Sequence, residues 1–286
     1  MAIVLRTHVR IPILTPQQLF QNAAMPTLTP TEFSLVYNVM SLCIAAMFAG
    51  ALFFFFSRSQ VAPKYRPALL ISALVPTIAC YHYFRIAHSF DASYMLVDGN
   101  YVASGELFND AYRYADWLLT VPLLVIELVA VLGLAKMASR SMSMRLSIAA
   151  ALMIVLGYPG EVATEASGKW LWWVLSMIPF LFIMFTLFTK FGSAVNSQPS
   201  SVQPIIKKAR GLILITWSFY PIAYLATVLG LSDAAGQVTL QVGYTIADIT
   251  SKVGLGIYIY FIAREKSDAD GYVVGSDGSE ASSKAA

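Results

Sequence analysis

The sequence predicts an all-α membrane protein, built as a bundle of seven membrane-spanning helices. Its 286 residues are 57% hydrophobic and only 12% charged, with a mean hydropathy of +0.65, a composition typical of membrane proteins. A helix needs about 20 mostly apolar residues to cross the roughly 30 Å hydrocarbon layer. Seven stretches qualify, at residues 33–57, 67–88, 107–134, 143–162, 170–191, 205–231 and 237–263. The net charge of +3 is too small to indicate a nucleic-acid partner.

The ends of the chain differ from this membrane domain, which we place at residues 32–264. Residues 1–31 contain only a short apolar run before Arg6, so they lack the core of a signal peptide and are interpreted as an external tail. Residues 265–286 are rich in Ser, Gly, Ala and Asp, which predicts a disordered cytoplasmic tail. Cys43 and Cys80 lie inside predicted spans and are interpreted as small buried hydrophobic residues. No metal site is predicted.

The loops indicate the orientation of the spans. Basic residues gather after spans one, three, five and seven, as with Arg58, Lys136, Lys207 and Arg264, whereas the other loops are mainly acidic. Because basic loops stay in the cytoplasm, we expect a multi-pass protein of the cell (inner) membrane with its N-terminus outside and its C-terminus in the cytoplasm. Asp98-Gly99-Asn100, between the second and third spans, lies between two β-favouring runs. It predicts a short external β-hairpin.

Span three carries most of the polar residues expected within the membrane. Arg113, Asp116, Thr120 and Glu127 are separated by three, four and seven residues, which places them near one helix face. The step from Asp116 to Glu127 covers about 16 Å along the helix axis, so the two carboxyls occupy the outer and inner halves of the membrane. One interpretation is a packing seam in which Arg113 and Asp116 form a simple ion pair. The other is a functional row.

Span seven adds a second pair of charges, Asp248 and Lys252, at the depth of Asp116. A lysine at the bilayer centre costs about 2.5 to 3.5 kcal/mol, so it should pair with a charge or carry chemistry. Glu127 has no cation nearby in the sequence, and an isolated carboxyl in an apolar region should remain protonated. His82 lies level with Asp116, either as a packing residue or as a modulator of that carboxylate.

Aromatic residues accompany these charges. Span six contains Trp217, Tyr220 and Pro221, and Trp117 follows Asp116 on span three. Pro221 should kink its helix near Trp217 because a proline removes a helical hydrogen bond. The aromatic side chains are interpreted either as ordinary core residues or as the walls of a flat slot for a long conjugated ligand.

These residues resemble those of the microbial (type 1) rhodopsins. The resemblance covers all seven spans and rests on three stretches: RYADWLLTVP from Arg113, WSFYP from Trp217 and DITSK from Asp248. YHYFR from Tyr81, GYPG from Gly157 and QVGYTIAD from Gln241 further resemble the branch of xanthorhodopsin and Gloeobacter rhodopsin, close to proteorhodopsin.

The resemblance implies a light-driven outward proton pump, which is a transporter and not an enzyme. All-trans retinal would be bound covalently to Lys252 as a protonated Schiff base, with Asp116 and Asp248 balancing its charge. The resemblance also implies that Asp116 accepts the proton and that Glu127 supplies one from the cytoplasmic side. Arg113, Thr120 and His82 would support the acceptor, and the residues implied beside retinal are Trp117, Leu124, Trp217, Tyr220 and Pro221.

The same resemblance sets expectations about partners. Protons and membrane lipid are expected, as is a homo-oligomer, and no transducer protein is expected. Relatives that carry a carotenoid antenna have a glycine on span five where this chain has Trp173. We therefore expect no antenna, because an indole would close the opening beside the retinal ring.

Two other functions remain open from the sequence. A photosensory rhodopsin that signals through a partner protein would need only the retinal site, although Glu127 argues against it. A retinal-free seven-helix transporter would use Asp248 and Lys252 as a coupling pair.

Overall fold

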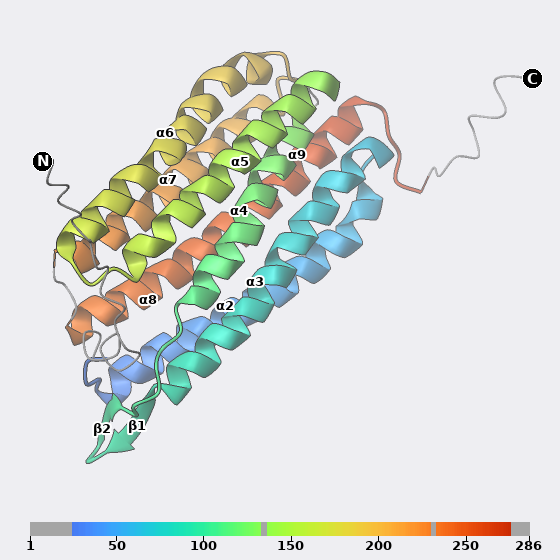
Figure 1. Cartoon of the computed structure of the whole chain (residues 1–286). Helices are drawn as coiled ribbons and strands as arrows, with labels where there is room; N and C mark the ends of the chain where they lie inside the picture. The colour runs from blue at the N-terminus through green and yellow to red at the C-terminus, as the bar shows by residue number, and fades with distance from the viewer. Residues whose placement is uncertain (1–24, 133–135, 230–232, 276–286) are drawn as a thin grey trace, which may run out of the picture.

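The computed structural model describes residues 25–132, 136–229 and 233–275, and within them it confirms the predicted bundle. Seven helical spans are long and apolar enough to cross a membrane. Five of them are α2 (Pro30–Ser57), α3 (Arg66–Ala92), α4 (Ala111–Val131), α5 (Lys136–Glu161) and α6 (Ala166–Asn196). The sixth is α7 (Gln203–Val228), and the seventh combines α8 (Ala234–Ile249) with α9 (Leu255–Ala269). Figure 1 shows these helices lying side by side along one axis.

The first and last spans begin with side-chain caps. Thr29 accepts a hydrogen bond from the backbone of Glu32 while the Glu32 side chain accepts one from the backbone of Thr29, and Pro30 occupies the first helical position. The Asp233 side chain similarly accepts from the backbone of Gly236 at the start of α8. These contacts satisfy backbone donors that have no partner within a helix.

A single π-helical turn, η3 (Thr250–Gly254), interrupts the last span. Lys252 lies at the centre of this turn, with α8 before it and α9 after it. Turns of this kind are rare and often occur at functional sites.

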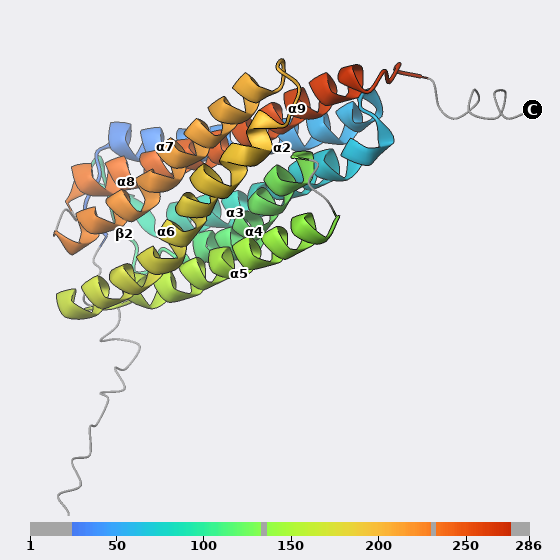
Figure 2. The same cartoon turned by 90° about the horizontal axis from the view of Figure 1, so that it is seen from above.

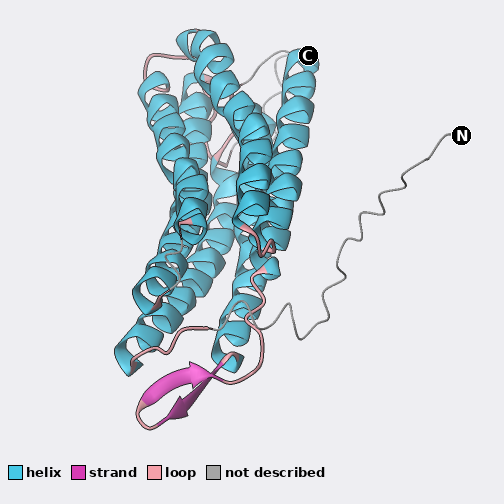
Figure 3. Cartoon of the chain, turned by 60° about the vertical axis from the view of Figure 1, so that its left-hand side comes forward, coloured by secondary structure: helices cyan, strands magenta, loops and turns pink. Residues whose placement is uncertain are grey.

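The predicted β-hairpin is present between α3 and α4. Strands β1 (Tyr94–Val97) and β2 (Asn100–Ala103) pair in antiparallel register from Tyr94 opposite Ala103 to Val97 opposite Asn100. Asp98 and Gly99 both have positive φ, at 47° and 80°, as the favoured two-residue hairpin turn requires. Figure 3 shows the hairpin at one end of the bundle, and Figure 1 shows that α9 ends at the other.

The helix α4 occupies a central place in the bundle. It packs against α3, α5 and α9, and Figure 2 shows it with α3 on one side and α5 on the other. Its polar residues Arg113, Asp116, Thr120 and Glu127 are all buried. Large apolar side chains such as those of Phe56, Phe185 and Ile215 are exposed on the outside of the bundle. This inversion, with polar groups inside and apolar groups outside, suits a protein surrounded by lipid.

The last helix extends beyond the boundary predicted at Arg264. It continues to Ala269, and Gly271, with φ of 75°, then reverses the chain so that the backbone NH of Tyr272 donates to the carbonyl of Ser267. This is a Schellman motif. Asp270 forms an ion pair with Lys64 at 2.9 Å and accepts a hydrogen bond from Tyr65. Although burial opposes the shift, these two contacts lower the pKa of Asp270. Residues 276–286 of the predicted tail, like residues 1–24, lie outside the described residues.

Candidate functional site

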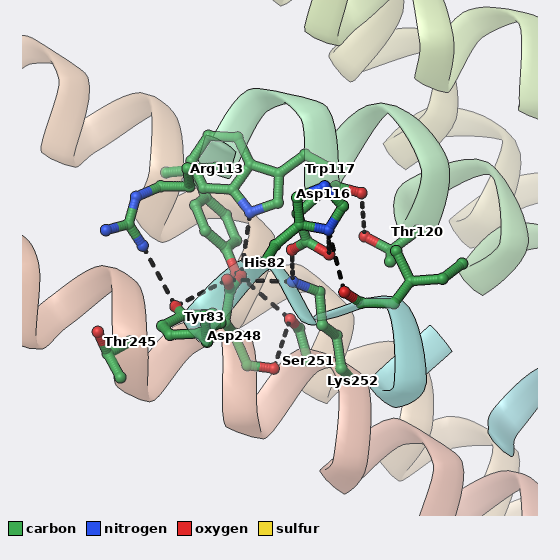
Figure 4. Close-up of polar contacts among 12 residues, drawn as sticks. His82, Tyr83, Arg113, Asp116, Trp117, Thr120, Thr245, Asp248, Ser251 and Lys252 are labelled. Carbon is green, nitrogen blue, oxygen red and sulfur yellow. Dashed lines mark hydrogen bonds and ion pairs between the residues drawn. The ribbon is translucent and has the colours of Figure 1, made fainter. Parts of the chain in front are cut away.

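Lys252 lies between two carboxylates in the middle of the bundle. The residue is only 2% exposed. Its ammonium nitrogen donates a hydrogen bond to Asp116 Oδ2 and lies 3.0 Å from Asp248 Oδ2 (Figure 4). Buried charges require such compensation, so the structure pairs the costly lysine of the last span with one carboxylate from α4 and one from its own helix.

Asp116 has one bonded oxygen and one open oxygen. Oδ2 accepts from Lys252, whereas Oδ1 has no hydrogen-bond partner among the described residues. His82 Nδ1, from α3, lies 4.0 Å from this open oxygen and 3.0 Å from the backbone carbonyl of Ile78. Two residues that the sequence placed at one depth are therefore neighbours, and the unbonded oxygen of Asp116 is available to receive a proton.

Asp248 is held by hydroxyl and indole donors from three other helices. Tyr220 from α7 donates to Oδ1 at 2.6 Å, Trp117 from α4 donates to the same oxygen at 3.1 Å, and Tyr83 from α3 donates to Oδ2 at 2.9 Å. Hydrogen bonds to a carboxylate favour its ionised form. The contrast with Asp116 is plain, because each Asp248 oxygen already has a donor besides Lys252.

Arg113 joins this cluster to the end of the bundle that carries the β-hairpin. It is fully buried, and its guanidinium donates to the hydroxyl of Tyr83 at 3.2 Å and to Gln241 Oε1 at 2.7 Å. Its ion pair within the described residues is with Asp110, at 3.0 Å. The alternative interpretation of Arg113 and Asp116 as a simple ion pair is therefore wrong. A row of contacts instead leads from Asp248 through Tyr83 and Arg113 to Asp110.

Thr120 is buried one helical turn after Asp116, and among the described residues it forms no hydrogen bond with the Asp116 carboxylate. Its hydroxyl donates to the backbone carbonyl of Asp116, at 2.8 Å, one helical turn earlier. Within the described residues this contact therefore fixes the backbone near Asp116 rather than its charge.

A cavity with mostly aromatic and aliphatic walls ends at Lys252. This cavity is lined by all five residues that the family resemblance implied beside retinal, which are Trp117, Leu124, Trp217, Tyr220 and Pro221. Its other lining residues include Tyr114, Met153, Gly157, Trp173, Met177, Phe180 and Tyr244. Among the described residues that line the cavity, Lys252 is the one with an amine side chain. An apolar slot that ends at an amine fits a long apolar aldehyde such as retinal, which an amine can bind covalently.

Trp173 forms part of the wall of this cavity. Its indole nitrogen donates to the backbone carbonyl of Pro221 at 3.0 Å, which connects α6 to α7. The side chain is therefore anchored against the neighbouring helix.

Glu127 lies eleven residues after Asp116 on α4, and its environment is quite different. It is fully buried, and Ser72 from α3 donates a hydrogen bond to Oε2 at 2.8 Å. Its other oxygen has no partner among the described residues. No ion pair to Glu127 occurs within the part of the chain that the structure describes. A carboxyl without a countercharge can be buried at lower cost when it is protonated.

Sequence reasoning did not single out Tyr83, Gln241 or Ser72. Tyr83 and Gln241 lie within the stretches that carry the family resemblance, but tyrosine and glutamine are also common packing residues. Ser72 carries no pattern that separates it from other serines in a membrane helix. The row of contacts around Arg113 depends on residues from α3, α4 and α8, and only the fold brings them together.

Comparisons with known proteins agree with this architecture. Residues 35–266 match the model of the family described as bacteriorhodopsin-like protein. The chain is 30% identical over 230 residues to the green-light absorbing proteorhodopsin of Gamma-proteobacterium EBAC31A08, covering 80% of this chain and 86% of that protein.

Two solved structures are also similar. One is that of xanthorhodopsin, described as a light-driven ion pump with dual chromophore, with 51% identity and a TM-score of 0.84, covering 87% of this chain and all of that one. Thermophilic rhodopsin gives 44% identity and a TM-score of 0.85 over the same 87% of this chain and all of that chain.

Proposed function

Because the chain belongs to the bacteriorhodopsin-like protein family, we propose that it is a light-driven pump that moves protons out of the cell. Its relatives are rhodopsins that act as light-driven ion pumps and not as enzymes. The protein is accordingly a multi-pass membrane rhodopsin and a light-driven ion pump. The transported ion, its direction and the residues that carry it are our proposal.

Family membership implies a retinal chromophore. Lys252 would hold it covalently, and Trp117, Leu124, Trp217, Tyr220 and Pro221 would enclose it. When bound, retinal supplies visible-light absorption and a change of shape on illumination. The aromatic walls exclude water from the Lys252 nitrogen, which strengthens the electrostatic interactions around it.

Asp116 is the proposed proton acceptor. It is the carboxylate hydrogen-bonded to the Lys252 nitrogen that still has an unbonded oxygen. Asp248 is less suited to that role, because Tyr220, Trp117 and Tyr83 already stabilise its charge. We assign Asp248 to the balance of charge, His82 to the modulation of Asp116, and Arg113 with Thr120 to the support of the acceptor.

Glu127 is the proposed proton donor. It lies on the same helix as Asp116, eleven residues further along, which is about 16 Å of helix axis. The observation that carries the proposal is this arrangement on α4: a carboxylate in a cluster of charges on one side of Lys252 and an uncompensated carboxyl on the other. The Lys252 nitrogen would first give its proton to Asp116, and Glu127 would then give a proton to the deprotonated nitrogen.

The direction follows from the proposed orientation of the chain. Glu127 lies in the second half of α4, toward the end of the bundle where Arg58 and Lys64 connect α2 to α3, whereas Asp116 lies in the first half of α4, after the hairpin. Basic connections face the cytoplasm, so we place the start of the chain, residues 1–31, outside the cell and the end, from residue 265, inside. Protons then move from the cytoplasm through Glu127 and Asp116 to the exterior.

We propose no carotenoid antenna for this chain. The support is Trp173, whose indole occupies the cavity wall and is anchored to Pro221. An excitation spectrum of the protein mixed with a hydroxylated carotenoid tests this: energy transfer to retinal would overturn it. We expect a homo-oligomer in lipid and no transducer partner.

The decisive experiment is a light-induced pH record from cells that produce the chain and receive retinal. Illumination should acidify the medium, and a protonophore should abolish the signal. Lys252→Ala is the matched control and should give protein without a visible absorption band. Alkalinisation that a protonophore increases would indicate another ion. No proton movement, together with a stable complex with a membrane partner, would indicate a photosensor.

A further inference from the structure

A second buried lysine, Lys266, lies near the proposed cytoplasmic end of the bundle. It is on α9, only 7% exposed, and its ammonium forms no ion pair within the described residues. The proposed pump cycle makes no use of it. A buried ammonium is costly unless its donors are satisfied, so its contacts indicate what it does.

The ammonium of Lys266 and the amide of Gln198 together cap the end of α4. Lys266 donates to the carbonyl of Val131, the last residue of α4, at 2.9 Å and to Gln198 Oε1 at 2.8 Å. Gln198 Nε2 in turn donates to the carbonyl of Leu132 at 2.9 Å. The final carbonyls of a helix have no partner within it, and a cation is favourable at this negative end. Here two distant segments of the chain supply the cap.

This cap lies one helical turn beyond Glu127. Val131 follows Glu127 by four residues on α4. The side chains of Leu128, Val131 and Leu132, which lie after Glu127, are fully buried. The described chain therefore places apolar packing and then the cap on the cytoplasmic side of the proposed donor. The fixed positive charge of Lys266 also opposes the arrival of a further cation by this route.

The cap is connected to the proposed retinal cavity through α7. Gln203, at the start of that helix, donates to the backbone carbonyl of Gln198 at 3.0 Å. Further along the same helix, Trp217 and Tyr220 form part of the cavity wall. The helix that lines the cavity is therefore hydrogen-bonded to the residue that bonds Lys266.

We propose that Lys266 and Gln198 are positioning residues that close the cytoplasmic route to Glu127. The proposal rests on the proposed function, because it takes Glu127 as the donor. The cap holds the last turn of α4 and keeps water from the Glu127 carboxyl. Breaking it lets a proton from the cytoplasm reach Glu127.

The test measures proton uptake by the full chain with retinal, in lipid nanodiscs, using a flash and a pH-indicator dye. Lys266→Met keeps the length and apolar stem of the side chain but removes the charge and the hydrogen bonds to Val131 and Gln198. Gln198→Ala removes the amide that bonds Lys266 and Leu132. Lys64→Met is the matched control, because Lys64 is a lysine of the same end whose partner, Asp270, is exposed.

Lys266→Met and Gln198→Ala should each accelerate proton uptake by about fivefold, the rate equivalent of roughly one lost hydrogen bond. The earlier transfer to Asp116 should keep its rate, and Lys64→Met should behave like the parent protein. Because both residues serve one cap, the double variant should be no faster than the faster single variant. A merely structural role would lower thermal stability and leave this uptake step unchanged.

Unchanged or slower uptake in both single variants, with a normal visible band, would overturn the proposal. If Lys266→Met yields no coloured protein, Gln198→Ala decides alone. Glu127→Gln is measured in parallel, because it tests Glu127 as the proton donor separately from the cap. Normal uptake in that variant would refute Glu127 as the donor, whereas slow uptake there beside normal uptake in the cap variants would refute only the cap.

Discussion

Asp116 and Glu127 are acidic residues on one helix, yet their surroundings differ in almost every respect. Asp116 forms an ion pair with Lys252 and lies near His82, and the same Lys252 nitrogen pairs with Asp248, so charged groups surround its carboxylate. Glu127 has one hydrogen bond, from Ser72, and apolar packing. In the proposed cycle, charge compensation prepares Asp116 to receive a proton, whereas the lack of compensation prepares Glu127 to hold one.

Removing the acceptor should have the largest effect. In Asp116→Asn we expect outward transport to fall by about a hundredfold or more, the scale of a lost proton-transfer group. The visible band should remain but move to longer wavelength, because Lys252 loses one of its two countercharges. The light-induced pH signal and the absorption spectrum check this together. Transport at the parent rate would show that another group accepts the proton.

Removing the proposed donor, Glu127, should reduce transport less than Asp116→Asn does and should leave the absorption maximum almost unchanged. Glu127→Gln should slow return of a proton to the Lys252 nitrogen by about a hundredfold, while transport continues at the slower rate. The absorption maximum should stay within a few nanometres, because no charge near Lys252 changes. Flash spectroscopy measures the recovery. A shift as large as that of Asp116→Asn would contradict the separation of the two regions.

Tyr83→Phe tests the network that surrounds the acceptor side. It removes the hydroxyl that donates to Asp248 and accepts from Arg113. Hydrogen bonds to charged groups contribute about 1.5 to 3 kcal/mol, so thermal bleaching of the visible band should occur about 5 °C lower. Tyr81→Phe is the matched control, because it makes the same substitution at an exposed position of the same helix. Equal melting of the two variants would argue against a stabilising network.

Ser72→Ala should give the smallest effect, on the donor side alone. The Ser72 hydroxyl stabilises the ionised carboxylate that Glu127 becomes when it gives up its proton. Losing about 1 kcal/mol of this stabilisation should slow proton donation roughly fivefold. Flash spectroscopy with Thr77→Ala provides the comparison, because among the described residues the Thr77 hydroxyl bonds only the backbone of its own helix. Faster donation in Ser72→Ala would reverse the assigned role of this bond.

Local sequence patterns were sufficient for the helices and the hairpin but not for every boundary. Long apolar runs and Asp98-Gly99 act within a few residues, so their outcome is visible in the sequence. The continuation of α9 past Arg264 depends on Gly271 and on the pairing of Asp270 with Lys64, which is distant along the chain. A tail rich in small polar residues therefore conceals a helix end stabilised by tertiary contacts.

The candidate site was predictable to a similar degree. Spacing placed Arg113, Asp116, Thr120 and Glu127 on one helix face, and the four are buried together. Spacing could not show that Arg113 pairs with Asp110 rather than with Asp116, because both lie three residues from it. Which neighbour a side chain selects depends on where Tyr83 and Gln241 come from other helices.

The π-helical turn at Lys252 has a consequence for how the last span tolerates changes in length. In an ordinary helix, adding or deleting one residue rotates everything beyond it by about 100°. A π-turn already absorbs one additional residue, so a single deletion within Thr250–Gly254 could restore α-helical geometry while leaving the faces of α8 and α9 as they are. Lys252 thus lies where this helix can change its length by one residue without losing its phase.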